Sequence, residues 1–60
     1  MPLKAYQVFE LTSGDQAVTR IDLYCESAED AKERAKQLVR DRTVELWEGS
    51  VLIARFESLH

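Results

Sequence analysis

The sequence predicts a small α+β domain with the element order β-β-α-β-β, in which a four-stranded antiparallel sheet carries one helix on one face. Three observations predict this fold. Four segments carry alternating or β-forming apolar residues, one segment between the second and the third has helical periodicity, and the connections are short. The chain has 60 residues and no linker, repeat or low-complexity tract, so residues 1–60 are expected to form a single domain.

The first two strands are predicted at Leu3–Leu11 and Ala17–Cys25, on either side of a polar turn at residues 12–15. The first run is rich in β-forming residues. The second alternates strictly, so that Ile21, Leu23 and Cys25 share one side. The two runs are therefore expected to form a β-hairpin whose second strand has one buried face.

A helix is predicted from Ser27 to near Asp41. The Ser27 hydroxyl can cap the free amides of the first turn, and Asp30 completes a variant of the capping box. Five apolar residues fall within one arc of this helix. They are Ala28, Ala31, Ala35, Leu38 and Val39. Because three of the five are alanine, the helix should lie close to the sheet and contribute little bulk.

Two further strands are predicted at Thr43–Trp47 and Val51–Glu57, around a turn at residues 48–50. The helical crossover would place the third strand beside the first. A two-residue turn would put Leu52 on the same face as Trp47, whereas a three-residue turn would put Ile53 there. A one-residue slip exchanges the two faces, and the sequence leaves both registers open.

Large apolar residues are expected on both faces of this sheet. Alternation along the strands assigns one group to the helix side: Phe9, Leu11, Ala17, Ile21, Leu23, Val44 and Leu46. It sends a second group to the opposite side: Tyr6, Val8, Val18, Tyr24 and Trp47. A sheet covered by one helix is normally polar on its other face, and exposed apolar patches usually mark an interaction surface. The predicted interaction surface is therefore Tyr6, Val8, Tyr24 and Trp47, with Leu52 or Ile53 according to the register.

The expected partner of this surface is a second copy of the chain, with another protein as the alternative. One cysteine cannot form an internal disulfide, and one histidine with one cysteine cannot build a four-ligand zinc site. A domain this small then depends on regular packing or on self-association. The homodimer would pack two sheets face to face or pair them along an edge. In the competing interpretation, the protein is a monomer whose outer aromatic residues are shielded by the stems of Arg20 and Arg55.

No constellation of catalytic or metal-ligating residues is visible, so we expect no enzymatic activity, no cofactor and no metal. His60 is the single histidine and the last residue. Cys25 follows the inward alternation beside Glu26 and resembles a small buried hydrophobic residue, although the nearby helix start leaves a redox role open. The carboxylates alternate with apolar residues along strands, which is typical of a solvated surface rather than of an acid–base pair.

A pocket for a small molecule is a second class of function. It would lie near Trp47 at the dimer seam, lined by Tyr24, Glu45 and Arg55. Glu45 and Glu48 flank the tryptophan and would rim such a pocket. The two glycines are isolated, so no phosphate-binding loop is predicted.

Nucleic-acid binding is a third class, and the charge disfavours it. Lys32, Lys36 and Arg40 form a basic i, i+4 row on the predicted helix, with Arg34 beside it. Acidic residues are interleaved with this row, and the net charge is −3, whereas a nucleic-acid binder normally carries a basic surplus. No apolar run is long enough to cross a membrane, and no signal peptide is visible. We therefore expect no membrane association and a cytoplasmic location.

The closing hairpin resembles that of a set of very short, uncharacterised bacterial proteins. The resemblance is carried by Val44-Glu45-Leu46-Trp47-Glu48-Gly49 followed by Leu52-Ile53-Ala54-Arg55. An aromatic-rich first strand, a glycine-containing turn and an alanine-rich helix extend it over most of the chain. It implies a free-standing bacterial domain of β-β-α-β-β order, and it implies no catalytic residue and no assigned activity.

Overall fold

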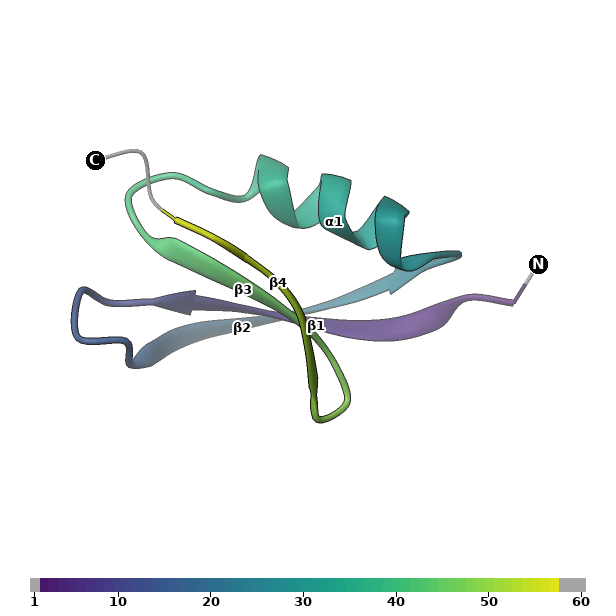
Figure 1. The fold of residues 1–60 in the computed structure, drawn as a ribbon, viewed down its shortest axis with the longest axis horizontal. Helices are drawn as coiled ribbons and strands as arrows, with labels where there is room; N and C mark the ends of the chain where they lie inside the picture. Colours follow the sequence, from purple (N-terminus) through teal and green to yellow (C-terminus); the bar gives the residue numbers. More distant parts are fainter. Residues whose placement is uncertain (1, 58–60) are drawn as a thin grey trace.

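The computed structural model describes residues 2–57, and these residues form the predicted β-β-α-β-β order. The elements are β1 (Lys4–Leu11), β2 (Ala17–Cys25), α1 (Ala28–Gln37), β3 (Thr43–Glu48) and β4 (Val51–Phe56). The strands form one antiparallel sheet in the order β2-β1-β3-β4, with α1 lying over one face of it (Figure 1). The predicted α+β fold is thereby confirmed, including the position of β3 beside β1.

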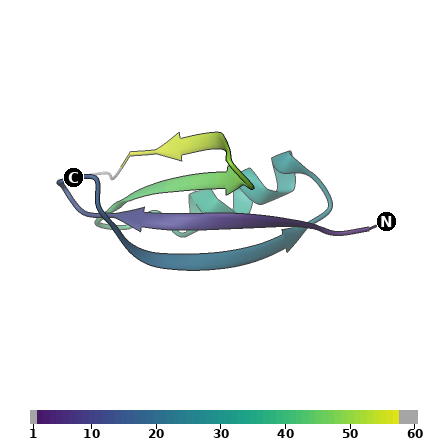
Figure 2. The same ribbon diagram turned by 90° about the horizontal axis from the view of Figure 1, so that it is seen from below.

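The helix joins two strands that do not pair with each other. Both β2 and β3 run antiparallel to β1, so they are parallel to each other and α1 crosses over β1 to connect them. Viewed from below the sheet, β2 and β4 form its two outer edges, and α1 lies behind it (Figure 2). One face of the sheet is therefore covered by α1 and the other is not.

The start of α1 agrees with the sequence, whereas its end does not. The Ser27 hydroxyl accepts a hydrogen bond from the Asp30 amide at 3.2 Å, which confirms the predicted N-cap. The helix ends at Gln37 and not near Asp41, because Leu38 and Val39 leave it through amide bonds to the carbonyls three residues back. Both residues still pack against the core from the connection to β3. The apolar spacing of Leu38 and Val39 therefore indicates that they are buried, and it does not show that they belong to the helix.

A β-bulge in the first hairpin overturns the predicted faces of β1. Val18 is an extra residue in β2, because Ala17 lies opposite Leu11 while Thr19 lies opposite Glu10. Beyond the bulge, Val8 lies opposite Ile21 and therefore shares its face.

The residues exchanged by this bulge include part of the predicted surface. Tyr6 and Val8 lie on the helix side and are at most 1% exposed, so their predicted outward placement is wrong. Phe9, which was expected under the helix, lies on the opposite face between Arg20 and Glu45. Without the extra residue, alternation would have placed the two strands as predicted.

A second bulge, in β4, follows the two-residue turn, so neither of the registers that the sequence left open holds along the whole strand. The turn at Gly49 and Ser50 has two residues, and Gly49 adopts the left-handed φ of 61° that favours glycine. Leu52 then lies opposite Trp47, but Ala54 lies opposite Leu46, so Ile53 is the extra residue. Leu52 therefore shares the face of Trp47, while Ile53 packs against the core on the helix side.

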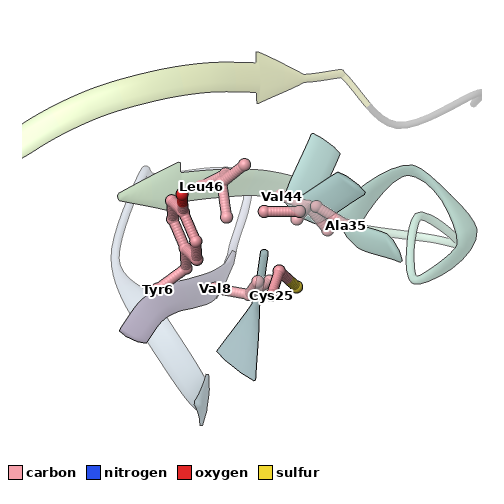
Figure 3. Packing of buried hydrophobic residues seen from close by; sticks show 7 residues of the cluster. Tyr6, Val8, Cys25, Ala35, Val44 and Leu46 are labelled. Carbon is pink, nitrogen blue, oxygen red and sulfur yellow. The ribbon is translucent and has the colours of Figure 1, made fainter. Parts of the chain in front are cut away.

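The core lies between α1 and the sheet, as the close view in Figure 3 shows. Its buried members are Tyr6, Val8, Cys25, Ala31, Ala35, Val44 and Leu46. The two alanines are fully buried, which confirms the predicted close approach of the helix to the sheet. Burial raises the pKa of the Tyr6 hydroxyl, and the negative charge of Glu48 raises it further.

Candidate functional site

The sheet face away from α1, here called the open face, carries a set of large apolar residues. Strand pairing places on it Phe9, Leu11, Tyr24, Trp47 and Leu52. In the part of the chain that the structure describes, no helix lies over this face (Figure 1). The open face therefore carries apolar side chains that no helix of the described chain covers.

These five side chains differ in their exposure. Tyr24 is 61% exposed and Leu52 is 45% exposed, whereas Phe9 and Trp47 are half-buried and Leu11 is buried. Tyr24 lies on the outer strand β2 and Leu52 on the outer strand β4, so the exposed members flank the less exposed ones. The open face is thus partly shielded along its middle and accessible along both sides.

A hydrogen-bonded network holds Trp47 in place on this face. The indole Nε1 of Trp47 donates to Oε1 of Glu45 at 3.1 Å, and Nη1 of Arg55 donates to Oε2 of the same carboxylate at 3.1 Å. Glu45 lies opposite Arg55 in the ladder, and the side chain of Glu45 is 17% exposed while that of Arg55 is 37% exposed, so the carboxylate is the more shielded member of the pair. The orientation of the Trp47 ring is therefore linked to a charged pair on the same face of the sheet.

Arg55 connects this pair to two further parts of the chain. Its Nη2 donates to Asp15 in the β1–β2 turn at 3.0 Å, and its Nε donates to Glu57 at 3.1 Å. Glu57 in turn accepts a hydrogen bond from the Thr43 hydroxyl at 3.2 Å. The bonds to Asp15 and Glu57 raise the pKa of the Arg55 guanidinium above its ordinary value. One cation thus joins the first turn, β3 and β4.

Half of the predicted interaction surface lies on the open face. Tyr24, Trp47 and Leu52 are there, as predicted. Tyr6, Val8 and Ile53 are on the helix side and do not belong to it. The residues that the sequence reasoning missed are Phe9 and Leu11, which the bulge at Val18 brings onto the open face. The alternation of apolar residues along β1 and β2 is visible in the sequence, but no residue near Val18 indicates that β2 contains a bulge there.

The predicted Trp47 pocket is only partly assembled. Trp47, Glu45 and Arg55 form one bonded group, whereas Tyr24 lies on the far side of β1. Glu48 alternates to the helix side, so it does not rim the tryptophan. Two cavities of about 550 and 360 Å³ are present, and Arg55 lines the smaller one, but neither is lined by Trp47 or Tyr24.

The remaining candidate residues have ordinary structural positions. Cys25 is a free, buried cysteine in the core, where its thiol has little access to a redox partner. Lys32 and Lys36 are exposed on α1, but Arg40 lies beyond the helix end, so the predicted i, i+4 basic row is interrupted. Within residues 2–57, no group of three or more His, Cys, Asp and Glu residues is arranged to hold a metal ion. His60 lies outside the described residues.

Comparison with protein-family models, with curated proteins and with solved structures found no match for this chain. The β-β-α-β-β order implied by the resemblance to short bacterial proteins is confirmed by the fold, while membership of that set and a bacterial origin stay predictions. Among residues 2–57, the structure contains no helix with the length and apolarity that crossing a membrane requires.

Proposed function

We propose that this protein is a small, non-enzymatic interaction module that associates with itself through the open face. The observation that carries the proposal is the apolar set on that face, which lies opposite α1 and includes the exposed Tyr24 and Leu52. Apolar patches of this kind are typical of protein–protein interfaces, and tryptophan and tyrosine are enriched at their centres. A cytoplasmic location is part of the proposal and agrees with a single unpaired cysteine, Cys25.

The network around Trp47 supports this proposal. The hydrogen bond from the indole to Glu45 restricts the ring before any partner binds, and a side chain that is already ordered loses less entropy on association. The same bond satisfies the polar end of the ring, so its apolar surface can be covered without leaving a buried donor unpaired. Glu45 and Arg55 are therefore expected to position Trp47 rather than to react.

Sedimentation velocity across the micromolar range tests self-association, with two neighbouring substitutions as a matched pair. Leu52→Lys introduces a charge into the open face, whereas Val51→Lys introduces it at an exposed neighbour that alternates to the other side of β4. Leu52→Lys should weaken the dimer at least about tenfold, because a buried unpaired charge opposes association. Val51→Lys should leave the dimer unchanged. A wild-type protein that stays monomeric throughout would overturn the proposal.

Trp47→Ala provides a second test of the same surface. Loss of a central tryptophan typically costs about 2 kcal/mol or more, which corresponds to roughly a 30-fold weaker dimer. Lys32→Glu on the exposed side of α1 is the control and should have no such effect. Equal dimer affinities for the two variants would contradict the choice of the open face.

The same proteins separate this proposal from the two other classes of function. A saturable change in Trp47 fluorescence with a panel of metabolites, in a protein that remains a monomer, would replace self-association with small-molecule binding. A salt-dependent mobility shift of labelled DNA by the monomer would replace it with nucleic-acid binding. We expect neither result.

A further inference from the structure

The outer edge of β2 is a long strand edge to which no described residue is paired. β2 has nine residues and pairs with β1 only, so its other side presents unpaired backbone donors and acceptors at the edge of the sheet (Figure 2). Such edges are normally blocked by proline, by charged side chains, lysine above all, or by a β-bulge. The charges of β2, Arg20 and Asp22, are of opposite sign. β2 contains no proline or lysine, and its bulge at Val18 lies near its start.

The opposite edge of the sheet is much less suited to pairing. β4 has six residues, and its bulge at Ile53 divides them into two short pieces. Its single charged residue, Arg55, is already bound to three carboxylates. The two edges therefore differ, and only β2 offers a continuous stretch for another strand.

The residues of β2 are self-complementary about Ile21, which is the centre of the strand. In an antiparallel pair of β2 strands related by a two-fold axis at Ile21, Arg20 lies opposite Asp22 of the second copy, and Asp22 lies opposite its Arg20. Within one chain, Nε of Arg20 is 3.3 Å from Oδ1 of Asp22, and both side chains are exposed on the open face. The pair would thus bring four charges of alternating sign together across the two-fold axis.

The neighbouring registers are electrostatically unfavourable. Pairs that keep the two open faces on the same side can move the two-fold axis only in steps of one residue. An axis at Arg20 places the two arginines opposite each other, and an axis at Asp22 places the two aspartates opposite each other. Like charges directly opposite in a ladder destabilise it, so the Arg-Ile-Asp sequence both favours the register at Ile21 and opposes its neighbours.

Exposed apolar residues support the same register. Val18 and Tyr24 are both among the exposed large apolar residues of the described chain, at 49% and 61%. Tyr24 lies three residues after Ile21, and Val18, the bulged residue at the start of β2, lies three residues before it, so the register at Ile21 brings each next to the other in the second copy. Cross-strand pairs of an aromatic and a β-branched residue stabilise a sheet. Two such pairs would flank the four charges.

We infer that β2 pairs antiparallel with β2 of a second copy of this chain, about a two-fold axis at Ile21. The result is one eight-stranded sheet with both helices on the same side and the two open faces side by side. This inference rests on Arg20, Asp22, Val18 and Tyr24, of which Tyr24 is shared with the proposed open-face contact. Trp47 and Leu52 take no part in the strand pairing, so substitutions at these two residues distinguish the pairing from packing between open faces.

Charge reversal tests the pairing. In Arg20→Asp both positions are acidic, and in Asp22→Arg both are basic, so each variant alone should dimerise at least about tenfold more weakly than the wild type. An equimolar mixture of the two variants places opposite charges opposite each other and should dimerise within about threefold of the wild type. The double variant R20D/D22R should do the same. Both residues are exposed, and circular dichroism of each variant checks that it folds.

Sedimentation velocity measures the dimer affinity of these four samples. Low salt is used because at physiological ionic strength interactions between exposed charges are screened over about 8 Å. Single variants that dimerise like the wild type would overturn the inference, as would a mixture that fails to recover. A dimer lost in Leu52→Lys but unaffected by both charge reversals would overturn the edge pairing and leave the open-face proposal intact. A dimer that is weakened by both charge reversals but unaffected by Leu52→Lys would support the edge pairing alone.

Hydrogen exchange gives a readout that needs no substitution. At concentrations where the protein is dimeric, the outward amides of β2 should exchange more slowly than in the monomer, while those of β4 should not change. Slower exchange confined to β4 would contradict the inference.

Discussion

On the face under α1, Tyr6, Val8 and Leu46 are at most 1% exposed, whereas on the open face Tyr24 is 61% exposed and Trp47 is half-buried. The first face is covered by the alanines of α1, which allow the helix to approach the sheet closely. The second is organised by Glu45 and Arg55, which hold the tryptophan through polar contacts.

This difference shows how a ten-residue helix limits a small domain. α1 is long enough to complete one apolar core, and the sheet offers more apolar side chains than that core contains. The surplus lies on the open face, and exposed apolar patches of this kind are typical of interaction surfaces. We expect substitutions on the covered face to change stability and those on the open face to change association.

The largest expected effect is on the covered face. Leu46→Ala leaves a cavity in the core and should lower the free energy of unfolding by about 2–5 kcal/mol, out of roughly 3–9 kcal/mol for a domain of this length. Leu52→Ala removes the same atoms from the open face and should cost about 0.5 kcal/mol or less. Urea unfolding followed by circular dichroism, at a concentration where the protein is monomeric, measures both. Equal losses would contradict the contrast between the faces.

A smaller effect is expected from the network on the open face. Arg55→Met leaves the shielded carboxylate of Glu45 without its cation, and it should lower the free energy of unfolding by about 0.5–1 kcal/mol. Arg34→Met, which disrupts an exposed pair with Asp30 on α1, is the control and should cost about 0.3 kcal/mol or less. The same urea series measures these values. A loss in Arg34→Met as large as that in Arg55→Met would indicate that the network adds nothing beyond an ordinary surface pair.

The smallest effect concerns the pH dependence of the covered face. Burial raises the pKa of Tyr6 in the folded protein, so its contribution to stability is complete below the pKa of about 10 in the unfolded chain. This contribution is lost as the pH rises from there through the higher folded pKa. Tyr6→Phe should therefore lose less stability than the wild type between pH 9 and 11, as measured by thermal unfolding. Identical alkaline profiles would contradict a protonated, buried Tyr6.

Much of the fold could be predicted because its signals are local. The alternating segment Ala17–Cys25 has the same bounds as β2, although the bulge at Val18 puts Ala17 opposite Leu11 and not on the predicted helix side, and Ser27 is the observed N-cap. The helix end was wrong because Leu38 and Val39 are buried by the connection to β3, and apolar spacing cannot distinguish that burial from a further helical turn.

The candidate site could be predicted only in part, because it depends on register. Trp47 and Tyr24 were placed correctly, since each lies on a strand whose buried side is unambiguous from its own alternation. β1 carries apolar residues on both sides, so the choice between Tyr6 and Phe9 depends on its pairing with β2. In β4, the two-residue turn was one of the two proposed registers, but the extra residue Ile53 shifts the rest of the strand into a register that was not proposed.

The amino-acid sequence alone determined the order of the elements, the alanine-lined face of α1 and the excess of apolar residues over what one helix can cover. Each follows from local propensity, periodicity or composition. Only the tertiary structure decided which side of β1 faces the helix, and where Leu52 and Ile53 point. Two single-residue bulges, at Val18 and Ile53, make that decision. A bulge shifts the face on which the following residues of its strand lie, and the packing that it serves involves other strands and α1, which the pattern of one strand does not indicate.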